Sequence, residues 1–245
     1  MTFDLLSEKL KSVFGQVHVE QKGTNTFDIA KRLDPEKGDA IVLLFEQTKG
    51  RGKGERVFLS QKGGIYFSLC CFDLDVKKVS LPKTVLNAGF AVYDTLVSYG
   101  FNPVLKWPND VLVNGKKVCG ILSEAVTCGD KVSLFCGVGI NVNTKDFGEL
   151  NSIATSLSIE SGKDIDIFQF AFDAIKHVYE QVLSDYDITE LFASKCEIVG
   201  KTVKVKQNDE SYNCVVKGIT PDGFLKAEKD GCEIKILCGD ISPAE

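Results

Sequence analysis

The dipeptide Asn114-Gly115, set between two short apolar runs, constrains the fold more than any other part of the sequence. Val111–Val113 precedes it and Val118–Leu122 follows it. Both residues of the dipeptide tolerate positive φ, as a two-residue turn between antiparallel strands requires, so we expect a tight hairpin. Four charged residues would then lie near one another: Lys106, Asp110, Lys116 and Lys117. Cations beside a carboxylate suit a site that handles phosphates and a carboxylate together, although a solvated hairpin with a charged tip accounts for them equally well.

A second segment, residues 47–58, alternates glycines with cations. Its glycines and cations are Gly50, Arg51, Gly52, Lys53, Gly54 and Arg56. Glycine lets a backbone approach a ligand closely and adopt positive φ, so amide groups of such a loop can converge on an anion. The spacing matches neither a P-loop nor a dinucleotide-binding fingerprint. Taken alone, this glycine loop is also typical of a flexible cationic surface segment.

The composition limits the class of protein. The 245 residues suffice for one good-sized domain plus a small one. No apolar run approaches the ~20 residues needed to cross a bilayer, and residues 1–9 mix acids into the start of the chain, which argues against a targeting peptide. The formal net charge of −5 disfavours a general nucleic-acid binder. We therefore expect a cytoplasmic protein with neither membrane nor DNA as a partner.

The nine cysteines indicate buried thiols, not a metal or disulfide framework. None forms a C-x-x-C pair, and the chain has only two histidines, His18 and His177. Clustered ligands for zinc are not visible, so we expect no metal site built by the protein alone. An odd number of cysteines, several inside apolar strands, is typical of reduced thiols in a cytosolic protein. Catalysis by a Cys–His pair has little support because neither histidine lies in a motif.

The apolar pattern predicts a mixed α+β chain that ends in short strands. Strands are expected at Val17–Glu20, Ala40–Glu46, Gly64–Phe72, Val104–Trp107, Asp110–Val113, Val118–Val126 and Val132–Val142. Helices are expected from Thr24 or Asn25 through Leu33, at Leu81–Tyr99 and at Ile167–Leu183. Short strands at Ile198–Val205, Ser211–Ile219, Gly223–Glu228 and Cys232–Leu237, separated by turns such as Asn208-Asp209-Glu210, indicate a small barrel.

In order and spacing, four motifs resemble those of the biotin protein ligases. They are the Gly-Arg-Gly-basic loop, Lys-Trp-Pro-Asn-Asp, Lys-x-x-Gly-Ile-Leu-x-Glu and Gly-x-Gly-Ile-Asn, here at Gly50–Lys53, Lys106–Asp110, Lys117–Glu124 and Gly137–Asn141. Residues 154–157, Ala-Thr-Ser-Leu, match a further family segment. The similarity runs from about residue 17 to the C-terminus. Each motif alone is weak evidence for this family, but the four motifs in this order are specific to it.

This resemblance implies an α+β fold in two parts. Residues 1–195 would form a biotin- and ATP-binding catalytic domain, a mixed sheet flanked by helices as in class II synthetases and biotin–lipoate ligases. Residues 196–245 would form a small SH3-like β-barrel docked against it. Some family members begin with a DNA-binding winged helix-turn-helix of roughly 60 residues. Only 16 residues precede the first expected strand, so we expect the form that lacks this domain, as a monomer or a homodimer.

The implied activity is an ATP-dependent protein modification. Biotin and ATP, with Mg²⁺, would give biotinyl-5′-AMP and pyrophosphate, and a specific lysine of a biotin carboxyl-carrier domain of a carboxylase would then capture the biotinyl group. A lipoate or octanoate ligase or transferase on the same fold is the alternative, and a non-catalytic biotin-binding module is a third possibility. Exchange of pyrophosphate into ATP that depends on biotin separates an enzyme from a binder.

The resemblance also implies the site residues. The catalytic candidates are Lys117, Arg51, Asp110 and Lys106. The residues expected to bind biotin or nucleotide are Thr24, Asn25, Gln47, Gly50, Arg51, Gly52, Lys53, Trp107, Asn109, Lys117, Gly120 and Asn141. No residue is assigned as a metal ligand.

Particular roles follow for some of these residues. Thr24 and Gln47 would bond the ureido ring of biotin, and Asn141 would contact adenine. Lys117 would act by its charge on the biotin carboxyl and the adenylate, while Asp110 could orient a Mg²⁺-bound water or Lys117, or assist deprotonation of the acceptor lysine. The chain departs from the family pattern at Gly23-Thr24, where Ser-Thr is common, and at Lys53, where Arg is common.

Overall fold

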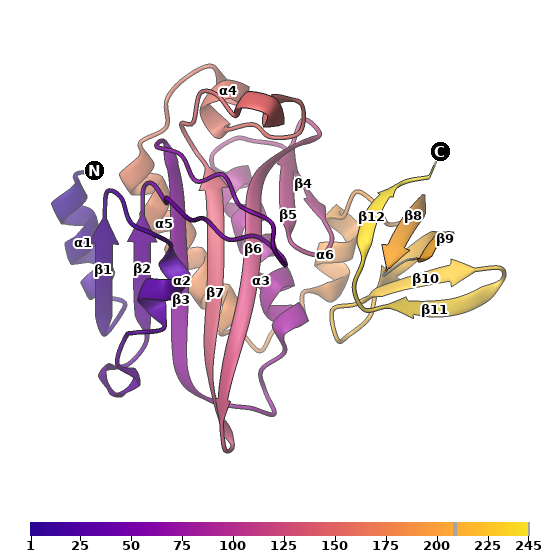
Figure 1. Cartoon of the computed structure of the whole chain (residues 1–245), viewed down its shortest axis with the longest axis horizontal. Coiled ribbons are helices and arrows are strands. Elements are labelled where there is room, and N and C mark those ends of the chain that lie inside the picture. The colour runs from indigo at the N-terminus through magenta and orange to yellow at the C-terminus, as the bar shows by residue number, and fades with distance from the viewer. Residues whose placement is uncertain (208–209, 245) are drawn as a thin grey trace.

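The chain folds into a large mixed sheet covered on both faces and a small antiparallel sheet at its C-terminal end (Figure 1). The structure is a computed structural model that describes residues 1–207 and 210–244. The predicted turn at Asn208-Asp209 therefore lies outside the described residues. The predicted α+β class is confirmed.

Seven strands make up the large sheet, in the order β1-β2-β3-β7-β6-β5-β4. They are β1 (Gln16–Glu20), β2 (Ala40–Leu44), β3 (Gly64–Asp75), β4 (Pro103–Lys106), β5 (Asp110–Val113), β6 (Lys116–Cys128) and β7 (Lys131–Asn141). β1 and β2 are parallel, and every other neighbouring pair is antiparallel. All seven predicted strands are present, with ends that differ by a few residues.

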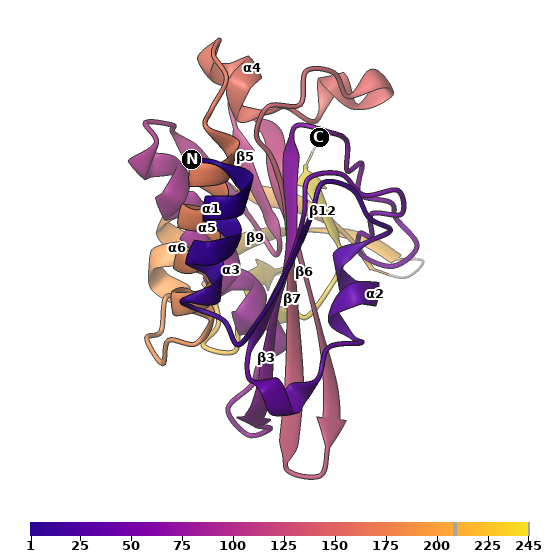
Figure 2. The same ribbon diagram turned by 90° about the vertical axis from the view of Figure 1, so that its left-hand side faces the viewer.

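The two faces of this sheet are covered differently, as the side view shows (Figure 2). One face carries the helices α1 (Phe3–Lys11), α3 (Leu81–Ser98), α5 (Ile167–Val182) and α6 (Thr189–Lys195). The other carries only the short α2 (Thr26–Ala30) and the glycine loop. Successive side chains of a strand point to opposite faces, so in β3 Phe67 and Leu69 enter the core under the helices, while Tyr66 and Ser68 bond to Gln61 and Thr26 on the other face.

The predicted hairpin is confirmed, and it contains an irregularity that the sequence did not indicate. Asn114 and Gly115 have φ values of 50° and 76°, as a two-residue turn with positive φ at both positions requires. β5 pairs with β6 through Leu112 with Lys117 and Val111 with Cys119, which leaves Val118 without a partner on β5. This β-bulge adds one residue to β6, so every side chain beyond it points to the opposite face of the sheet from the one it would otherwise face.

The C-terminal residues form the predicted small β unit, a five-stranded antiparallel sheet of order β11-β10-β9-β8-β12. Its strands are β8 (Thr202–Gln207), β9 (Glu210–Ile219), β10 (Leu225–Lys229), β11 (Cys232–Ile236) and β12 (Asp240–Pro243). The indole Nε1 of Trp107 donates to the carbonyl of Gly223 at 3.1 Å, and Glu197 N donates to Leu105 O at 2.9 Å. One apolar core runs through both sheets, so the small sheet is docked on the large one. The division at residue 195 stays a prediction.

Several helices differ from the sequence prediction. The helix expected from Thr24 or Asn25 through Leu33 begins where predicted, with Asn25 as its N-cap, but it ends at Ala30. α1, α6 and α4 (Leu157–Ser161) were not predicted. The signal for α1 was present, since Thr2 caps it and Leu6 and Leu10 bury one face. None of the helices in residues 1–207 and 210–244 is long and apolar enough to cross a membrane.

Candidate active site

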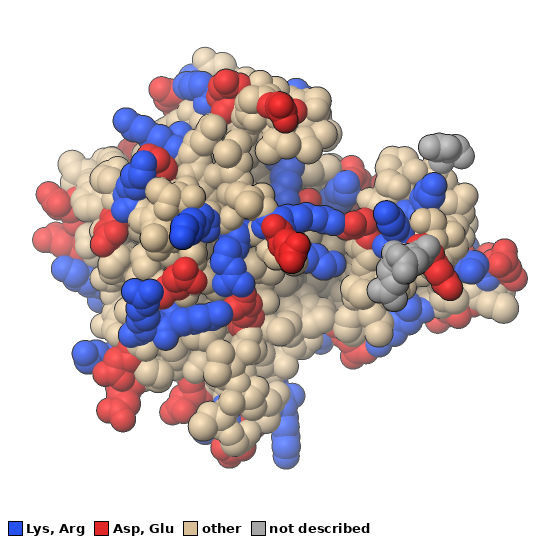
Figure 3. Space-filling model, in the orientation of Figure 1, with Lys and Arg blue, Asp and Glu red and all other residues tan. Residues whose placement is uncertain are grey.

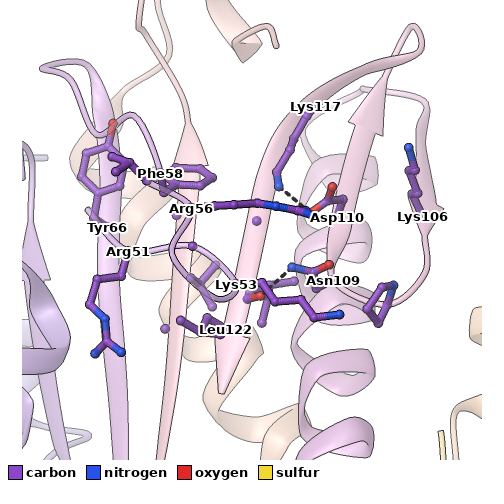
Figure 4. Close-up of a pocket in the computed structure, with 18 of the residues that line it drawn as sticks. Arg51, Lys53, Arg56, Phe58, Tyr66, Lys106, Asn109, Asp110, Lys117 and Leu122 are labelled. Atoms are coloured by element: carbon purple, nitrogen blue, oxygen red, sulfur yellow. Dashed lines mark hydrogen bonds and ion pairs between the residues drawn. The ribbon is translucent and has the colours of Figure 1, made fainter. Parts of the chain in front are cut away.

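A cavity of about 310 Å³ lies on the face of the large sheet that carries α2. Its walls come from the N-terminus of α2, the glycine loop, the turn between β4 and β5, strands β3, β6 and β7, and the start of β12. Motifs far apart in sequence therefore meet around one space (Figure 4).

The floor of this cavity consists of glycines covered by two aromatic rings. A Cβ atom built on Gly120 or Gly139 would lie 2.8 or 2.7 Å from ring atoms of Phe58, and one on Gly137 would lie 2.4 Å from the ring of Phe27. No side chain larger than hydrogen fits at these positions, because such contacts are well inside van der Waals distance. Sequence reasoning singled out Gly120 but missed Phe58 and Phe27.

One wall presents Thr26 and Gln47, which are bonded to each other and to two serines behind them, Ser60 and Ser68. The backbone N–H of Thr26 donates to Gln47 Oε1 at 2.9 Å, and Gln47 Nε2 donates to Ser60 Oγ at 2.9 Å. Ser68 Oγ donates to Thr26 Oγ1 at 2.7 Å. Such an ordered wall can exchange hydrogen bonds with a buried polar ring at low entropic cost. Ser68 was discernible in the sequence as the one serine in the otherwise apolar or aromatic run from Ile65 to Phe72.

Thr24 and Asn25 lie at the edge of this wall. Asn25 lines the cavity and is 3% exposed, but its Oδ1 accepts from Asp28 N at 2.8 Å as the cap of α2. Thr24 is exposed and does not line the cavity, and its carbonyl accepts from Lys49 N at 2.9 Å. The threonine that lines the cavity is Thr26, two residues further on.

Five cationic side chains line the cavity: Arg51, Lys53, Arg56, Lys106 and Lys117. In the view of Figure 3, Lys and Arg side chains gather across the middle of the molecule, around the hollow between the two sheets. A concave site with this many cations attracts anions and stabilises developing negative charge. The charge of the whole chain, −5, gave no indication of this local excess.

Carboxylates accompany three of these cations. Lys117 Nζ lies 2.5 Å from Asp110 Oδ1, Arg51 Nη2 lies 2.7 Å from Glu124 Oε1, and Arg56 pairs with Asp240. Within residues 1–207 and 210–244, no ion pair holds Lys53 or Lys106. The Arg56–Asp240 pair is largely exposed, and such pairs contribute about 0–1 kcal/mol, so an incoming polyanion can displace Asp240 at low cost. The Lys117–Asp110 pair is half-buried.

The bulge in β6 decides which lysine faces the cavity. Lys117 and Gly120 are three residues apart yet share the cavity face, because the unpaired Val118 lies between them. A Cβ on Gly120 would lie 3.0 Å from Lys117 Nζ. Lys116 turns away, and its Nζ donates to the carbonyl of Asn151 at 2.8 Å. The expectation that Lys116 joins the other three charged residues is therefore wrong.

Residues of the turn between β4 and β5 brace the cavity. Asn109 Nδ2 donates to Ile121 O at 3.0 Å, and Ile121 N donates to Asn109 O at 2.9 Å. Trp107, one of the expected binding residues, is 3% exposed and lines the cavity as an apolar wall, while its N–H bonds to the small sheet. Lys106 lines the cavity from the last position of β4.

Two other predicted residues lie behind the cavity walls. Gly50 is buried, and a Cβ there would lie 2.2 Å from the carbonyl oxygen of Phe58, so it allows the two arms of the glycine loop to approach. Asn141, at the end of β7, is 3% exposed and donates from Nδ2 to Thr155 O at 3.1 Å. Its Oδ1 is buried and has no hydrogen-bond partner among the described residues.

The cavity contains two carboxylates that could approach a cation, Asp110 and Asp240. In the described part of the chain, no three His, Cys, Asp or Glu side chains are grouped so that they could hold a metal ion. Mg²⁺ is commonly bound by one or two carboxylates together with substrate phosphates. The residues present fit a Mg²⁺ ion that arrives with a nucleotide, and they do not form an all-protein cage.

Comparison with known proteins places the matched motifs in one family. Residues 18–141 match the model of the "Biotin/lipoate A/B protein ligase family". The chain is 35% identical over 235 residues to the "Biotin--[acetyl-CoA-carboxylase] ligase" of Mycobacterium tuberculosis, covering 91% of this chain and 86% of that protein. It is 34% identical over 229 residues to the "Bifunctional ligase/repressor BirA" of Bacillus subtilis, covering 87% of this chain and 68% of that protein.

The fold is also similar to that of solved structures. The biotin protein ligase from Aquifex aeolicus in complex with biotin and ATP superposes with a TM-score of 0.80 at 29% identity, covering 94% of this chain and 98% of that chain. The biotin protein ligase of Leishmania major, at 21% identity, has the same fold with a TM-score of 0.62. The similarity extends over both sheets, since 94% of the chain is covered.

Proposed function

The chain belongs to the biotin protein ligase family, and from this membership we propose that it joins biotin to a specific lysine of a carrier domain in two steps driven by ATP. In the first step the biotin carboxylate attacks the α-phosphate, giving biotinyl-5′-AMP and pyrophosphate. In the second step the lysine amine attacks the mixed anhydride, giving an amide and AMP. The observation that carries the proposal is the five cations gathered beside a polar wall over a glycine floor.

The polar wall suits the ureido ring of biotin. That ring has two N–H donors and one carbonyl acceptor, and burying it without partners would cost several kcal/mol. Gln47 and Thr26 line the cavity and are held by Ser60 and Ser68 behind them, so they offer donors and acceptors in an ordered array. We assign to Thr26 the role that the family pattern suggests for Thr24, because the Thr24 side chain does not face the cavity.

The cations reduce the repulsion between the two anions that must react in the first step. A carboxylate must approach a triphosphate that carries about four negative charges, and positive side chains fixed around the reacting atoms reduce the repulsion and stabilise the transition state. Lys117 lies over the floor glycines, where the reacting carboxylate and the α-phosphate would meet. Arg51, Lys53 and Arg56 on the glycine loop and Lys106 on β4 line the same cavity and would surround the phosphates.

Asp110 has its ion-pair partner in place before any ligand binds. Its carboxylate holds Lys117 Nζ at 2.5 Å, so its first role is to hold that ammonium in position in the cavity. Mg²⁺ arriving with ATP would reduce the charge of the triphosphate, with Asp110 as the cavity carboxylate able to reach it or its waters, whereas Asp240 is engaged by Arg56. Asn141 would read the adenine base through its unpaired Oδ1.

The names of the relatives suggest the acceptor. Two of them, from Paracoccus denitrificans and Mycobacterium tuberculosis, are named biotin--[acetyl-CoA-carboxylase] ligases. We therefore propose the biotin carrier domain of acetyl-CoA carboxylase as the protein partner.

The first test is exchange of labelled pyrophosphate into ATP by the purified chain. We expect exchange that requires biotin and Mg²⁺ and that does not require a carrier protein, because the first step is complete without it. A chain that binds biotin yet shows no biotin-dependent exchange would be a binding module, and the proposal would be wrong.

The second test distinguishes biotin from fatty acyl substrates. A ligand that binds only the native state raises the melting temperature. We expect stabilisation by biotin and little by lipoate or octanoate, since an acyl chain offers no hydrogen-bonding groups to the polar wall at Gln47 and Thr26. Stabilisation by octanoate and not by biotin would favour the acyl transferase alternative.

A further inference from the structure

Glu160, a residue outside every motif noted above, connects the β5–β6 hairpin turn to the segment that holds Asn141 behind the cavity wall. It lies in the short helix α4, near the turn of the β5–β6 hairpin (Figure 1). Its Oε2 accepts from Asn114 Nδ2 at 2.5 Å, and its Oε1 accepts from Thr155 Oγ1 at 2.5 Å. One carboxylate thus ties the hairpin turn to the segment that precedes α4.

Thr155 passes this restraint on to two residues of the proposed site. The carbonyl of Thr155 accepts from Asn141 Nδ2 at 3.1 Å, and its N–H donates to the carbonyl of Lys117 at 3.0 Å. Thr155 is 1% exposed and Asn141 is 3% exposed. Buried groups bonded in series hold one another in a single orientation, because no water is present to replace a lost partner.

The consequence for Asn141 is a fixed direction of its amide. With Nδ2 engaged by Thr155 O, Oδ1 must point the other way, and it has no partner within residues 1–207 and 210–244. A buried carbonyl oxygen without a partner is costly, so a ligand donor that meets it gains binding energy. The 6-amino group of adenine is such a donor, whereas hypoxanthine carries an oxygen at that position.

We propose that Glu160 is a positioning residue for nucleotide recognition, acting through Thr155 to hold Asn141 Oδ1 toward the base. This rests on the proposed function, in particular on the reading of adenine by Asn141. Glu160 does not touch substrate. It sets the ATP preference of the site by fixing the segment that orients Asn141, while the biotin wall around Gln47 and Thr26 is built from other segments.

The test is steady-state pyrophosphate exchange with Glu160→Ala, using ATP and ITP as nucleotides and biotin as the acid. We expect KM for ATP to rise about tenfold, as for the loss of one buried hydrogen bond, and the preference for ATP over ITP to fall by a similar factor. KM for biotin should change less than twofold. Glu149→Ala is the matched control, because Glu149 is an exposed glutamate of the same connecting segment, and it should leave all three values unchanged.

Three further variants make the outcome decisive. Thr155→Val removes only the hydroxyl that bonds Glu160 and should reproduce the loss of ATP preference, even if Glu160→Ala fails to fold. Glu160→Gln keeps an acceptor for Thr155 Oγ1 and should restore most of the preference. Asn141→Ala should abolish the preference, and adding Glu160→Ala to it should have no further effect on the ATP-to-ITP ratio.

The possible failures are distinguishable. If the unmodified chain shows no biotin-dependent exchange of pyrophosphate into ATP, the proposed function is wrong, and the role proposed for Glu160 is wrong as well. If exchange is normal but Asn141→Ala keeps its ATP preference, Asn141 does not read the base. If Asn141→Ala loses the preference while Glu160→Ala and Thr155→Val keep it, the role proposed for Glu160 is overturned and the rest stands.

Discussion

Arg56 of the glycine loop donates from Nη2 to both carboxylate oxygens of Asp240, at 2.8 and 2.6 Å, and so joins residues 184 positions apart. The pair links the loop that covers the cavity to the first residue of β12 in the small sheet. Its hydrogen bond lowers the pKa of the Asp240 carboxyl and, with the negative charge, raises that of the Arg56 guanidinium. Both side chains line the cavity, and Figure 4 shows Arg56 extending toward Asp110.

Removal of the Asp240 carboxylate should strengthen nucleotide binding without changing stability. The pair is largely exposed, so its own contribution to folding is small, but Asp240 neutralises a cation that the triphosphate needs. We expect Asp240→Ala to lower KM for ATP several-fold at low salt, and Arg56→Glu to raise it. Asp222→Ala, which breaks a similar exposed pair with Lys235 away from the cavity, should change neither. An unchanged KM for ATP in both Asp240→Ala and Arg56→Glu would contradict this role.

Lys117→Ala should reduce adenylate formation about 100- to 1,000-fold, the typical effect of deleting a donor that stabilises transition-state charge. The measurement is single-turnover formation of the adenylate. Lys116→Ala is the natural control, because the adjacent lysine carries the same charge but bonds to Asn151 outside the cavity. Equal losses in the two variants would show that general charge, and not the position of Lys117, is responsible.

Lys53→Gly should release the reactive adenylate more readily and label bystander proteins. The loop loses a phosphate-facing cation, and an added glycine raises the entropic cost of ordering it. Adenylate synthesis should partly survive, because Lys117, Lys106 and Arg51 remain. Streptavidin blotting of an unrelated lysine-rich protein gives the readout, with Lys49→Gly outside the cavity as control. Bystander labelling no greater than that of the unmodified chain would refute the retention role.

Backbone amides of the glycine loop should exchange more slowly when biotin and ATP are bound. The loop is a narrow hairpin held by Gly52 N to Arg56 O at 2.8 Å and Phe58 N to Gly50 O at 3.2 Å, with Val57 78% exposed. Such a segment opens easily, and ligand contacts supply the interactions it lacks. Hydrogen exchange of residues 49–60 is the measurement, and the turn at residues 128–131 should show no change. Identical exchange of the loop with and without ligands would exclude ligand-driven ordering.

Stability should fall as the pH rises from about 9 toward 12, because buried thiols resist ionisation. Burial raises the pKa of Cys70 and of Cys136 to about 12, from a usual value of 9.0. A folded-state pKa above the unfolded one favours folding below pH 9, and this advantage disappears as the pH passes through the folded-state pKa. Denaturant titrations at several pH values would detect it.

Thiol labelling provides a simpler check of the same burial. Three cysteines are exposed, Cys128, Cys232 and Cys238, and six are buried. At pH 8 we expect a maleimide to modify three thiols in the native chain and all nine in denaturant. Rapid reaction of more than three native thiols would show that the core opens more easily than the structure indicates.

Much of this protein was determined by the sequence itself, because the relevant signals are local. Positive φ at Asn114 and Gly115 follows from those two residue types and fixes the hairpin. Apolar runs located all seven strands of the large sheet, and the ordered motifs identified the family and its ligase activity, which the comparisons confirm. Eleven of the fourteen predicted site residues also line the cavity. Nine of them lie within the motifs, namely Arg51, Gly52, Lys53, Lys106, Trp107, Asn109, Asp110, Lys117 and Gly120, and the other two are Asn25 and Gln47.

Only the tertiary structure decided which residues lie together in the site. A side chain in a strand faces one side or the other with a period of two, and a single unpaired residue reverses every position beyond it. Val118 is that residue in β6, and it places Lys117 with Gly120 in the cavity while Lys116 turns away. Asp240 reaches Arg56 only because the small sheet docks through Trp107. Contacts between residues so distant in sequence depend on the packing of whole sheets, which no local pattern encodes.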